Sequence, residues 1–419
     1  MNMHSSECTT SGFAYLEPVK MEKNPMNDLK TMSEEVENEL LNHILPFWDA
    51  LKDDRGGFYG LMDFDLKIEK DAVKGVILNN RILWFYSNVY LNTKEKNALA
   101  NAQHAYLFLK QSCFDEQYGG VYWMMNYDGT PNDDMKHTYN QAFAIYGLSS
   151  YYAASGDKEA LQLAYQLYHT IETKCTDVYG YQEAFDRCWQ PIENEKLSED
   201  GFNAKKSMNT LLHIIEAYTE LYRVDPNRDV GNSLKKALRL CKNKVYDSKS
   251  HVLGVFFDEQ MKSIADLYSY GHDIEATWLI DRACEVLTDD ALTVEMGVMT
   301  AQIADKVLES AFENGALNNQ RCRGTIDKTR VWWVQAESVI GFLNSYQKSG
   351  DERFLQASLE IWEYIKKYII DRRNGSEWYW CVDSHGEPIR EEPIVEPWKC
   401  PYHNSRMCME VMKRNADFS

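Results

Sequence analysis

Two short segments of this chain carry side chains that could move a proton. Residues 270–278 read Tyr-Gly-His-Asp-Ile-Glu-Ala-Thr-Trp, and residues 397–406 read Pro-Trp-Lys-Cys-Pro-Tyr-His-Asn-Ser-Arg. Each places a histidine, His272 or His403, near the start of a predicted helix. Histidine has an unperturbed pKa of about 6.5, so both of its protonation states are accessible near neutrality. Two imidazoles in one sugar-sized pocket could remove a proton from one face of a carbon and return it to the other.

The two histidines are 131 residues apart, so only a fold that joins distant helix starts can bring them together. A repeat along the chain predicts such a fold. Glycine turns flanked by aromatic residues recur six times, at Gly57, Gly120, Gly180, Gly254, Gly315 and Gly375. Their spacings of 63, 60, 74, 61 and 60 residues indicate one supersecondary unit repeated along the chain.

Between these turns the apolar residues follow the helical period, two segments to each interval. We count twelve helices from Ser33 onward, the first at residues 34–51 and the last at residues 402–412. An open solenoid would carry polar caps at its ends, whereas both of these helices are amphipathic. The sequence therefore predicts an all-α closed (α/α)6 barrel at residues 33–419, preceded by a disordered extension at residues 1–32.

The helices that follow the glycine turns carry unusual polar residues and are predicted to form the inner ring. Their polar and aromatic residues are Arg81, Tyr139, Asn140, Asn209, His213, His272, Glu275, Trp333, Glu337, His403 and Arg406. Members three or four positions apart share a helix face, so a central polar pocket is expected. Tryptophans in the predicted loops could stack on a sugar ring: Trp123, Trp189, Trp378, Trp380 and Trp398.

Four interpretations of these residues remain open. An inverting glycosidase could use Glu275 and Glu337 as its two carboxylates, which leaves the histidines without a role. Epimerisation beside a carbonyl would use two histidines as acid and base, and Arg81 for the developing oxyanion. A zinc site of His213, His272 and His403 lacks any local ligand spacing that supports it. A sugar-binding protein without catalysis would give the paired imidazoles no function.

The bulk composition limits the partners. A formal net charge of -19 disfavours nucleic acid and anionic membranes. No run of about 18 apolar residues is present, and the ten cysteines form no CxxC pair. We therefore expect reduced core thiols and a cytoplasmic location.

Five segments of the chain resemble the cellobiose-epimerising enzymes of the N-acylglucosamine 2-epimerase superfamily. These segments are residues 75–87, 136–140, 270–278, 329–337 and 398–406, and the similarity runs from about Ser33 to the C-terminus. The resemblance implies an (α/α)6 barrel that reversibly converts cellobiose to 4-O-β-D-glucosyl-D-mannose, with lactose also accepted. It implies no metal or nucleotide cofactor, and we expect a monomer or a weak homodimer. A 2-epimerase of a free or N-acetylated monosaccharide is the alternative within this fold.

The resemblance also assigns roles by position. His272 and His403 would be the catalytic acid/base pair, and Arg81 and His213 would contact the oxygens of the reacting sugar. The substrate-binding residues would be Tyr139, Asn209, Glu275, Trp278, Trp333, Glu337 and Trp398.

Overall fold

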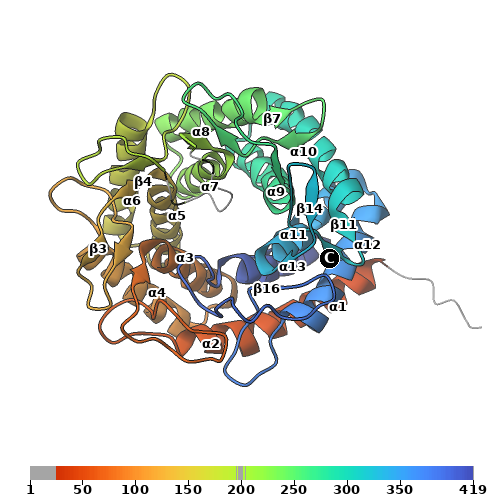
Figure 1. Ribbon diagram of the computed structural model, residues 1–419, viewed down its shortest axis with the longest axis horizontal. Coiled ribbons are helices and arrows are strands. Elements are labelled where there is room, and N and C mark those ends of the chain that lie inside the picture. The colour runs from red at the N-terminus through yellow and green to blue at the C-terminus, as the bar shows by residue number, and fades with distance from the viewer. Residues whose placement is uncertain (1–24, 195, 197–201, 203, 419) are drawn as a thin grey trace, which may run out of the picture.

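A computed structural model describes residues 25–194, 196, 202 and 204–418, and it has the predicted double ring of helices (Figure 1). The inner helices are α3 (Val76–Thr93), α5 (Thr138–Ser155), α7 (Met208–Val224), α9 (Tyr270–Leu287), α11 (Trp332–Ser349) and α13 (Tyr402–Phe418). They pack on one another in this order, and α13 packs on α3, so the ring is closed. The predicted (α/α)6 barrel is confirmed.

Six further helices in the described residues form the outer ring. They are α1 (Pro25–Glu39) with α2 (Leu45–Asp49), α4 (Lys96–Phe108), α6 (Lys158–Thr170), α8 (Arg228–Leu240), α10 (Asp290–Ala311) and α12 (Glu352–Tyr364). Five of them contain or end in a π-helical turn: Leu40–Ile44 joins α1 to α2, and the others are Leu109–Cys113, Ile171–Cys175, Cys241–Val245 and Ile365–Ile369. Each outer helix packs on an inner one, with α1 against α13.

Burial distinguishes the two rings. Every residue of α5 from Thr138 to Tyr151 is buried, because this helix lies between the outer ring and the barrel axis. The outer helix α8 buries one stripe, as an amphipathic surface helix does. Short turns join the two rings: Gly156 ends α5 with a φ of 75°, and Asp157 caps α6 by accepting a hydrogen bond from the Glu159 amide (2.9 Å).

Each predicted glycine turn marks a short antiparallel hairpin between an outer helix and the next inner one, although Gly254 follows the fourth hairpin rather than lying in its turn. In the fourth unit the hairpin is β7 (Tyr246–Asp247) with β8 (Val252–Leu253), and in the fifth it is β11 (Phe312–Glu313) with β12 (Ala316–Leu317). In the other four a single bridge closes the hairpin. Gly120 has a φ of 76°, and a Cβ there would lie 2.5 Å from the Trp189 ring, so the turn requires glycine.

Further strand pairs link each unit to the next at the same end of the barrel. They are β1 (Lys74–Gly75) with β2 (Met124–Met125) and β3 (Pro131–Asp133), β4 (Lys136–His137) with β5 (Ala184–Phe185), β6 (Lys206–Ser207) with β9 (Phe256–Phe257), β10 (Leu267–Ser269) with β13 (Gln320–Cys322) and β14 (Thr325–Asp327), and β15 (Arg330–Val331) with β16 (Cys381–Val382). Met62 pairs with Val395, which joins the first unit to the last.

A buried basic residue ties most inner helices to the preceding hairpin. Lys74, Lys136, Lys206, Arg330 and Lys399 occupy this place, and Tyr268 occupies it in the fourth unit. The ammonium of Lys74 lies 2.7 Å from Asp53, and that of Lys399 lies 2.6 Å from Glu377. Because these charges are paired, the hairpins can pack against the helix starts without leaving a buried cation unpaired.

A buried amide makes the second tie. Gln141 of α5 accepts a hydrogen bond from the Val121 amide (2.7 Å) and donates one to the Val121 carbonyl (2.8 Å). Gln335 of α11 makes the same pair of bonds with Leu317 (2.8 and 2.9 Å). Such ties fix the height of each inner helix relative to its hairpin, and therefore the level of every side chain it points inward.

The inner helices are consequently in register. Their sixth residue is Arg81 in α3, Phe143 in α5, His213 in α7, Glu275 in α9 and Glu337 in α11, and the corresponding fifth residue of α13 is Arg406. His272 and His403 lie three residues earlier on α9 and α13, about one helical turn nearer the hairpins. The repeat therefore brings residues far apart in the chain to common levels on the barrel axis.

The first helix begins earlier than the sequence analysis predicts, at Pro25 rather than Glu34. Leu29 and Met32 of α1 are buried in the core, so the predicted boundary between residues 32 and 33 falls inside a packed helix. Residues 1–24 of the predicted extension lie outside the described residues. The nine described cysteines are unpaired. None of the described helices has the length and apolarity needed to cross a bilayer.

We predict that Gln335→Met lowers the free energy of unfolding by about 2–4 kcal/mol, because two buried backbone groups of Leu317 lose their partners. Thermal and urea unfolding would measure the loss. Gln356→Met is the matched control, since Gln356 is exposed and bonds only Glu360, and its effect should stay within about 0.5 kcal/mol. Equal effects of the two substitutions would contradict a structural role for the amide tie.

Candidate active site

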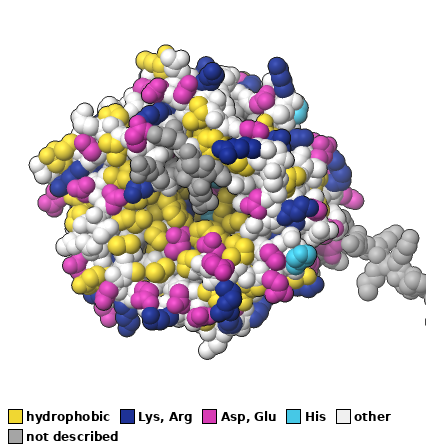
Figure 2. Space-filling view, in the orientation of Figure 1, with side chains coloured by type: hydrophobic (Ala, Val, Ile, Leu, Met, Phe, Trp, Pro, Cys, Tyr) yellow, Lys and Arg dark blue, Asp and Glu magenta, His cyan; other side chains and the backbone are white. Residues whose placement is uncertain are grey.

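A cavity of about 250 Å³ lies on the barrel axis at the hairpin end. The space-filling view shows the hollow at the centre of this face, with hydrophobic side chains around it (Figure 2). Nine of the eleven predicted site residues line the cavity: Arg81, Tyr139, Asn209, His213, His272, Glu275, Trp333, Trp398 and His403. All but Trp398 come from inner helices, as the sequence analysis predicts, and Trp398 comes from the loop before α13.

Three histidines line the cavity, and each is held through its Nδ1 atom. Nδ1 of His213 lies 2.9 Å from Glu216, Nδ1 of His403 lies 2.7 Å from Glu337, and Nδ1 of His272 lies 2.7 Å from the Ser269 hydroxyl. Among the described residues, none hydrogen-bonds the Nε2 atom of these rings. The Nε2 atoms are therefore available to a ligand in the cavity.

The imidazoles of His272 and His403 share one aromatic neighbour. The Trp333 indole lies 4.7 Å from the His272 ring and 5.4 Å from the His403 ring, measured between centroids. The centroids of the two imidazoles are therefore at most 4.7 plus 5.4 Å apart. Their helices, α9 and α13, lie on either side of α11, so the two rings reach the cavity from different directions (Figure 1).

Burial keeps these histidines neutral. It lowers the pKa of His272 to about 3, and the nearby His213 and Arg81 lower it further. Burial also lowers the pKa of His213 to about 4, although its bond to Glu216 opposes this. The pKa of His403 is well below its ordinary value, because burial and the charges of Arg406 and Arg81 disfavour the imidazolium. Each ring is therefore neutral when it meets a ligand.

Arg81 supplies a positive charge that no carboxylate neutralises. Its guanidinium donates to the Tyr139 hydroxyl (2.7 Å) and the Trp398 carbonyl (3.3 Å), and it packs 4.2 Å from the centre of the Phe143 ring. No carboxylate of the described residues forms an ion pair with it, and its Nε has no partner. An unpaired buried cation at the cavity wall is suited to stabilising a developing oxyanion.

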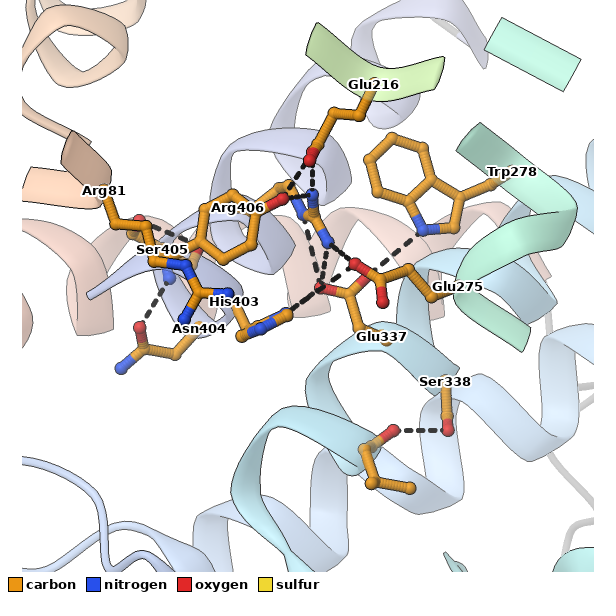
Figure 3. A network of polar contacts seen from close by, with 12 residues as sticks. Arg81, Glu216, Glu275, Trp278, Glu337, Ser338, His403, Asn404, Ser405 and Arg406 are labelled. Atoms are coloured by element: carbon orange, nitrogen blue, oxygen red, sulfur yellow. Dashed lines mark hydrogen bonds and ion pairs between the residues drawn. The ribbon is translucent and has the colours of Figure 1, made fainter. Parts of the chain in front are cut away.

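A second arginine lies just below the cavity and gathers three carboxylates (Figure 3). Arg406 of α13 forms ion pairs with Glu216 of α7, Glu275 of α9 and Glu337 of α11, the last at 2.6 Å. Its Nη2 atom serves both Glu275 and Glu337, and Tyr402 bonds Glu216 beside it. One guanidinium therefore links four of the six inner helices.

This cluster has more acids than cations. Burial would raise the pKa of Glu216, but Arg406, His213 and Tyr402 lower it. Burial raises the pKa of Glu275 to about 8 and that of Glu337 to about 7, and Arg406 offsets this only in part. The atoms of Glu275, Glu337 and His403 lie within 4.8 Å of one another, as ligands of a metal ion would. However, Arg406 already supplies the cation that bonds both carboxylates.

The structure places two predicted substrate-binding residues behind the cavity wall. Trp278 and Glu337 line no part of the cavity, and the Trp278 indole donates a hydrogen bond to Glu337 (3.0 Å). Trp278 is the ninth residue of α9, one turn deeper than Glu275. Among the loop tryptophans, Trp380 and Trp398 line the cavity, whereas Trp378 is buried and bonds Glu39 (2.8 Å).

Two supporting residues are absent from the sequence-based set. Glu216 could have been found, because it follows His213 by three positions on one helix face. Ser269 lies just before α9, and nothing in the sequence separates it from an ordinary residue before a helix.

Comparison with known proteins supplies a family for this arrangement. Residues 56–405 match the family model described as N-acylglucosamine 2-epimerase. The chain is 55% identical over 387 residues to cellobiose 2-epimerase of Ruminococcus albus, covering 92% of this chain and 100% of that protein. It is 48% identical over 388 residues to cellobiose 2-epimerase of Dictyoglomus turgidum, with the same two coverages. The solved cellobiose 2-epimerase of Bacillus thermoamylovorans superimposes with a TM-score of 0.89 at 47% identity, covering 92% of this chain and 100% of that one.

We predict that Arg406→Met lowers the free energy of unfolding by about 3–5 kcal/mol at pH 8, because three buried carboxylates lose their cation. Without it, the pKa values of Glu275 and Glu337, already above those of the unfolded chain, rise further, and that of Glu216 rises as well. The variant's stability is then retained at low pH and lost as the pH rises through these values. Thermal unfolding at pH 5 and pH 8 would measure this, with exposed Arg353→Met as control. A pH-independent loss would contradict the ionic role.

Proposed function

This chain belongs to the N-acylglucosamine 2-epimerase family, and we propose that it epimerises the reducing-end glucose of cellobiose at C2, giving 4-O-β-D-glucosyl-D-mannose. The identity to cellobiose 2-epimerases over nearly the whole chain supports this substrate. The single structural observation that carries the proposal is a pair of neutral imidazoles, His272 and His403, that reach one cavity beside an unpaired arginine. We extend the proposal to lactose, which also has a glucose at its reducing end.

The reaction requires removal of a weakly acidic proton. The reducing-end sugar opens to the aldehyde, with Arg81 and His213 beside its oxygens. One of the two histidines removes the C2 proton through Nε2, and the electrons of the C–H bond form a cis-enediolate. The guanidinium of Arg81 stabilises its negative charge. The other histidine then delivers a proton to the opposite face of C2, which inverts the configuration.

Aromatic rings around the cavity suit a sugar with a second residue attached. Trp333 lies against both histidines, where the reacting glucose must bind. Trp380 and Trp398 also line the cavity and offer flat faces for the second sugar. A monosaccharide 2-epimerase would make less use of these rings.

Glycoside hydrolysis is poorly served by this geometry. Two catalytic carboxylates must flank the scissile bond at about 5–5.5 Å or about 6.5–9.5 Å, with one on each side. Glu275 and Glu337 instead converge on one nitrogen of Arg406, and Glu337 lies behind the wall. Independence from metal and nucleotide, the cytoplasmic location and the monomeric or weakly dimeric state stay predictions.

We predict that cellobiose incubated with the protein and EDTA in D2O develops a mannose-type reducing end with deuterium at C2. The proton delivered to C2 comes from the second histidine, which has equilibrated with D2O, so the product carries deuterium at C2. A time course of proton NMR spectra would measure both signals. Release of free glucose would instead indicate hydrolysis, and a C2 position without deuterium would exclude the proton-transfer mechanism.

We predict that His272→Asn or His403→Asn lowers kcat by at least about 100-fold, because either change removes one acid/base group. Binding of cellobiose should weaken far less, since Arg81, Trp333 and Trp398 remain. Steady-state kinetics and calorimetric binding would separate the two effects. His169→Asn is the control, because His169 is on the outer helix α6, away from the cavity, and its kcat should match that of the unchanged protein. A fully active His272→Asn enzyme would contradict the two-histidine assignment.

A further inference from the structure

We propose that Glu337 holds the proton that His403 delivers to C2, and passes it to Nδ1 of His403 as Nε2 of the same ring protonates the carbon. This inference rests on the proposed function and adds a proton relay behind one of the two histidines. Glu337 contacts no cavity space, so it acts through His403 as a positioning and relay residue rather than on the sugar.

The relay is supported first by the geometry of the Glu337–His403 pair. Oε1 of Glu337 lies 2.7 Å from Nδ1 of His403, and the carboxyl group is fully buried. The imidazole therefore lies between the carboxyl group and the cavity. A proton on Glu337 can reach the substrate through the ring, by entering at Nδ1 while another leaves from Nε2.

The relay is supported also by the charge of the cluster around Arg406. Glu216, Glu275 and Glu337 share Arg406, so the fully ionised cluster would keep an uncompensated negative charge in a buried place. Retention of one proton relieves the repulsion between Glu275 and Glu337, whose oxygens converge on one nitrogen.

Groups on every neighbouring inner helix affect this proton. The titratable and charged groups facing the pair are Arg81 of α3, Tyr139 of α5, His213 and Glu216 of α7, His272 and Glu275 of α9, and Tyr402 and Arg406 of α13. Arg81 and Arg406 both disfavour a second cation on His403. Burial raises the pKa of Glu337 to about 7 and holds that of His403 well below its ordinary value. Between these two bonded groups the carboxyl group therefore holds a proton in preference to the ring, and Glu275, whose pKa burial raises to about 8, competes for the same proton.

The relay explains how a histidine that resists protonation can act as an acid. Before transfer, Glu337 is a carboxylic acid whose O–H points at Nδ1, and the neutral ring carries its proton on Nε2. The C2–H bond forms with the electrons of the enediolate as the Nε2–H bond breaks, and the Glu337 O–H bond breaks as the Nδ1–H bond forms. The products are a carboxylate and a neutral ring protonated on Nδ1. His272 then gives the proton it removed to water, and the cluster takes one back.

The second histidine has no such partner. Nδ1 of His272 meets the hydroxyl of Ser269, which does not ionise near neutrality. His272 therefore works as a simple base that becomes an imidazolium, whereas His403 works with a carboxyl group. Proton transfer at the C2 face that meets His403 therefore requires Glu337, whereas transfer at the face that meets His272 does not.

We predict that Glu337→Gln separates hydrogen exchange from epimerisation. The amide can bond Nδ1 but cannot supply or accept a proton, so kcat should fall at least about 100-fold with little change in KM. The substrate epimer whose C2 proton faces His272 should still exchange that proton with D2O, within about tenfold of the unchanged rate. The other epimer must give its proton to His403, and its exchange should be lost. Mass spectrometry of each recovered epimer measures this.

Two further variants separate the relay from support of the fold. Glu337→Asp keeps a carboxyl group and should recover part of the lost exchange. Glu220→Gln removes another buried carboxylate of α7, one that bonds Ser150 and Arg223 rather than Arg406 or His403, and should leave the ratio of exchange between the two epimers unchanged. If Glu337→Gln slows exchange equally from both epimers, or from neither, the relay is wrong. If the unchanged protein exchanges neither epimer, the proposed function itself fails.

A measurement on the unchanged protein covers the case in which Glu337→Gln does not fold. In the direction in which His403 delivers the proton, and under conditions where D2O slows kcat but C2-deuterated substrate does not, the rate in H2O–D2O mixtures should fall on a curve, because two solvent-derived protons move together. A straight line would mean a single proton in transfer and would overturn the relay.

Discussion

The barrel's active end depends on one ionic interaction, the contact of Arg406 with three glutamates. Glu216, Glu275 and Glu337 come from three different inner helices, and a fourth helix supplies the arginine. Removing Arg406 would leave three buried acidic groups without their cation, which is why such an ion cluster is rigid once formed. Two of these glutamates also hold His213 and His403 by Nδ1. The same cluster therefore closes the ring of helices and orients two of the three imidazoles.

The contrast between the two buried arginines divides the site into two layers. Arg406 is neutralised by its neighbours, whereas Arg81 has only neutral oxygens and aromatic faces around it. A cation in that setting is destabilised by desolvation unless an anion arrives. Arg81 thus favours any step that creates negative charge in the cavity, while Arg406 only holds the walls. If Arg81 had carboxylate partners as Arg406 does, the cavity wall would carry a neutralised ion pair instead of an unpaired positive charge.

Much of this arrangement could be predicted from the sequence, because the repeat is regular. The near-regular spacing of the glycine turns predicts one unit repeated six times, and the polar residues after the turns predict a central pocket. The common level of Arg81, His213 and Glu275 could not be predicted in this way, because they follow Gly57, Gly180 and Gly254 by 24, 33 and 21 residues; each is the sixth residue of its helix in the structure. The direction in which a side chain points was harder to predict. Trp278 and Glu337 lie on inner helices with their neighbours, yet their side chains lie below the cavity rather than in its lining, because they bond each other and Glu337 bonds Arg406. The start of α1 was also missed, since Leu29 and Met32 bury themselves against helices that follow much later in the sequence.

The position of α13 in the chain has a consequence for biosynthesis. α13 is the last of the described helices to leave the ribosome, and it carries both Arg406 and His403. Until it emerges, the three glutamates of the other helices lack Arg406, and the inner ring cannot close between α11 and α3. Contacts that join the two ends of a chain form late, because the entropy of closing so long a loop must be overcome first. The inner ring therefore cannot close, and the catalytic centre cannot assemble, before α13 has been made.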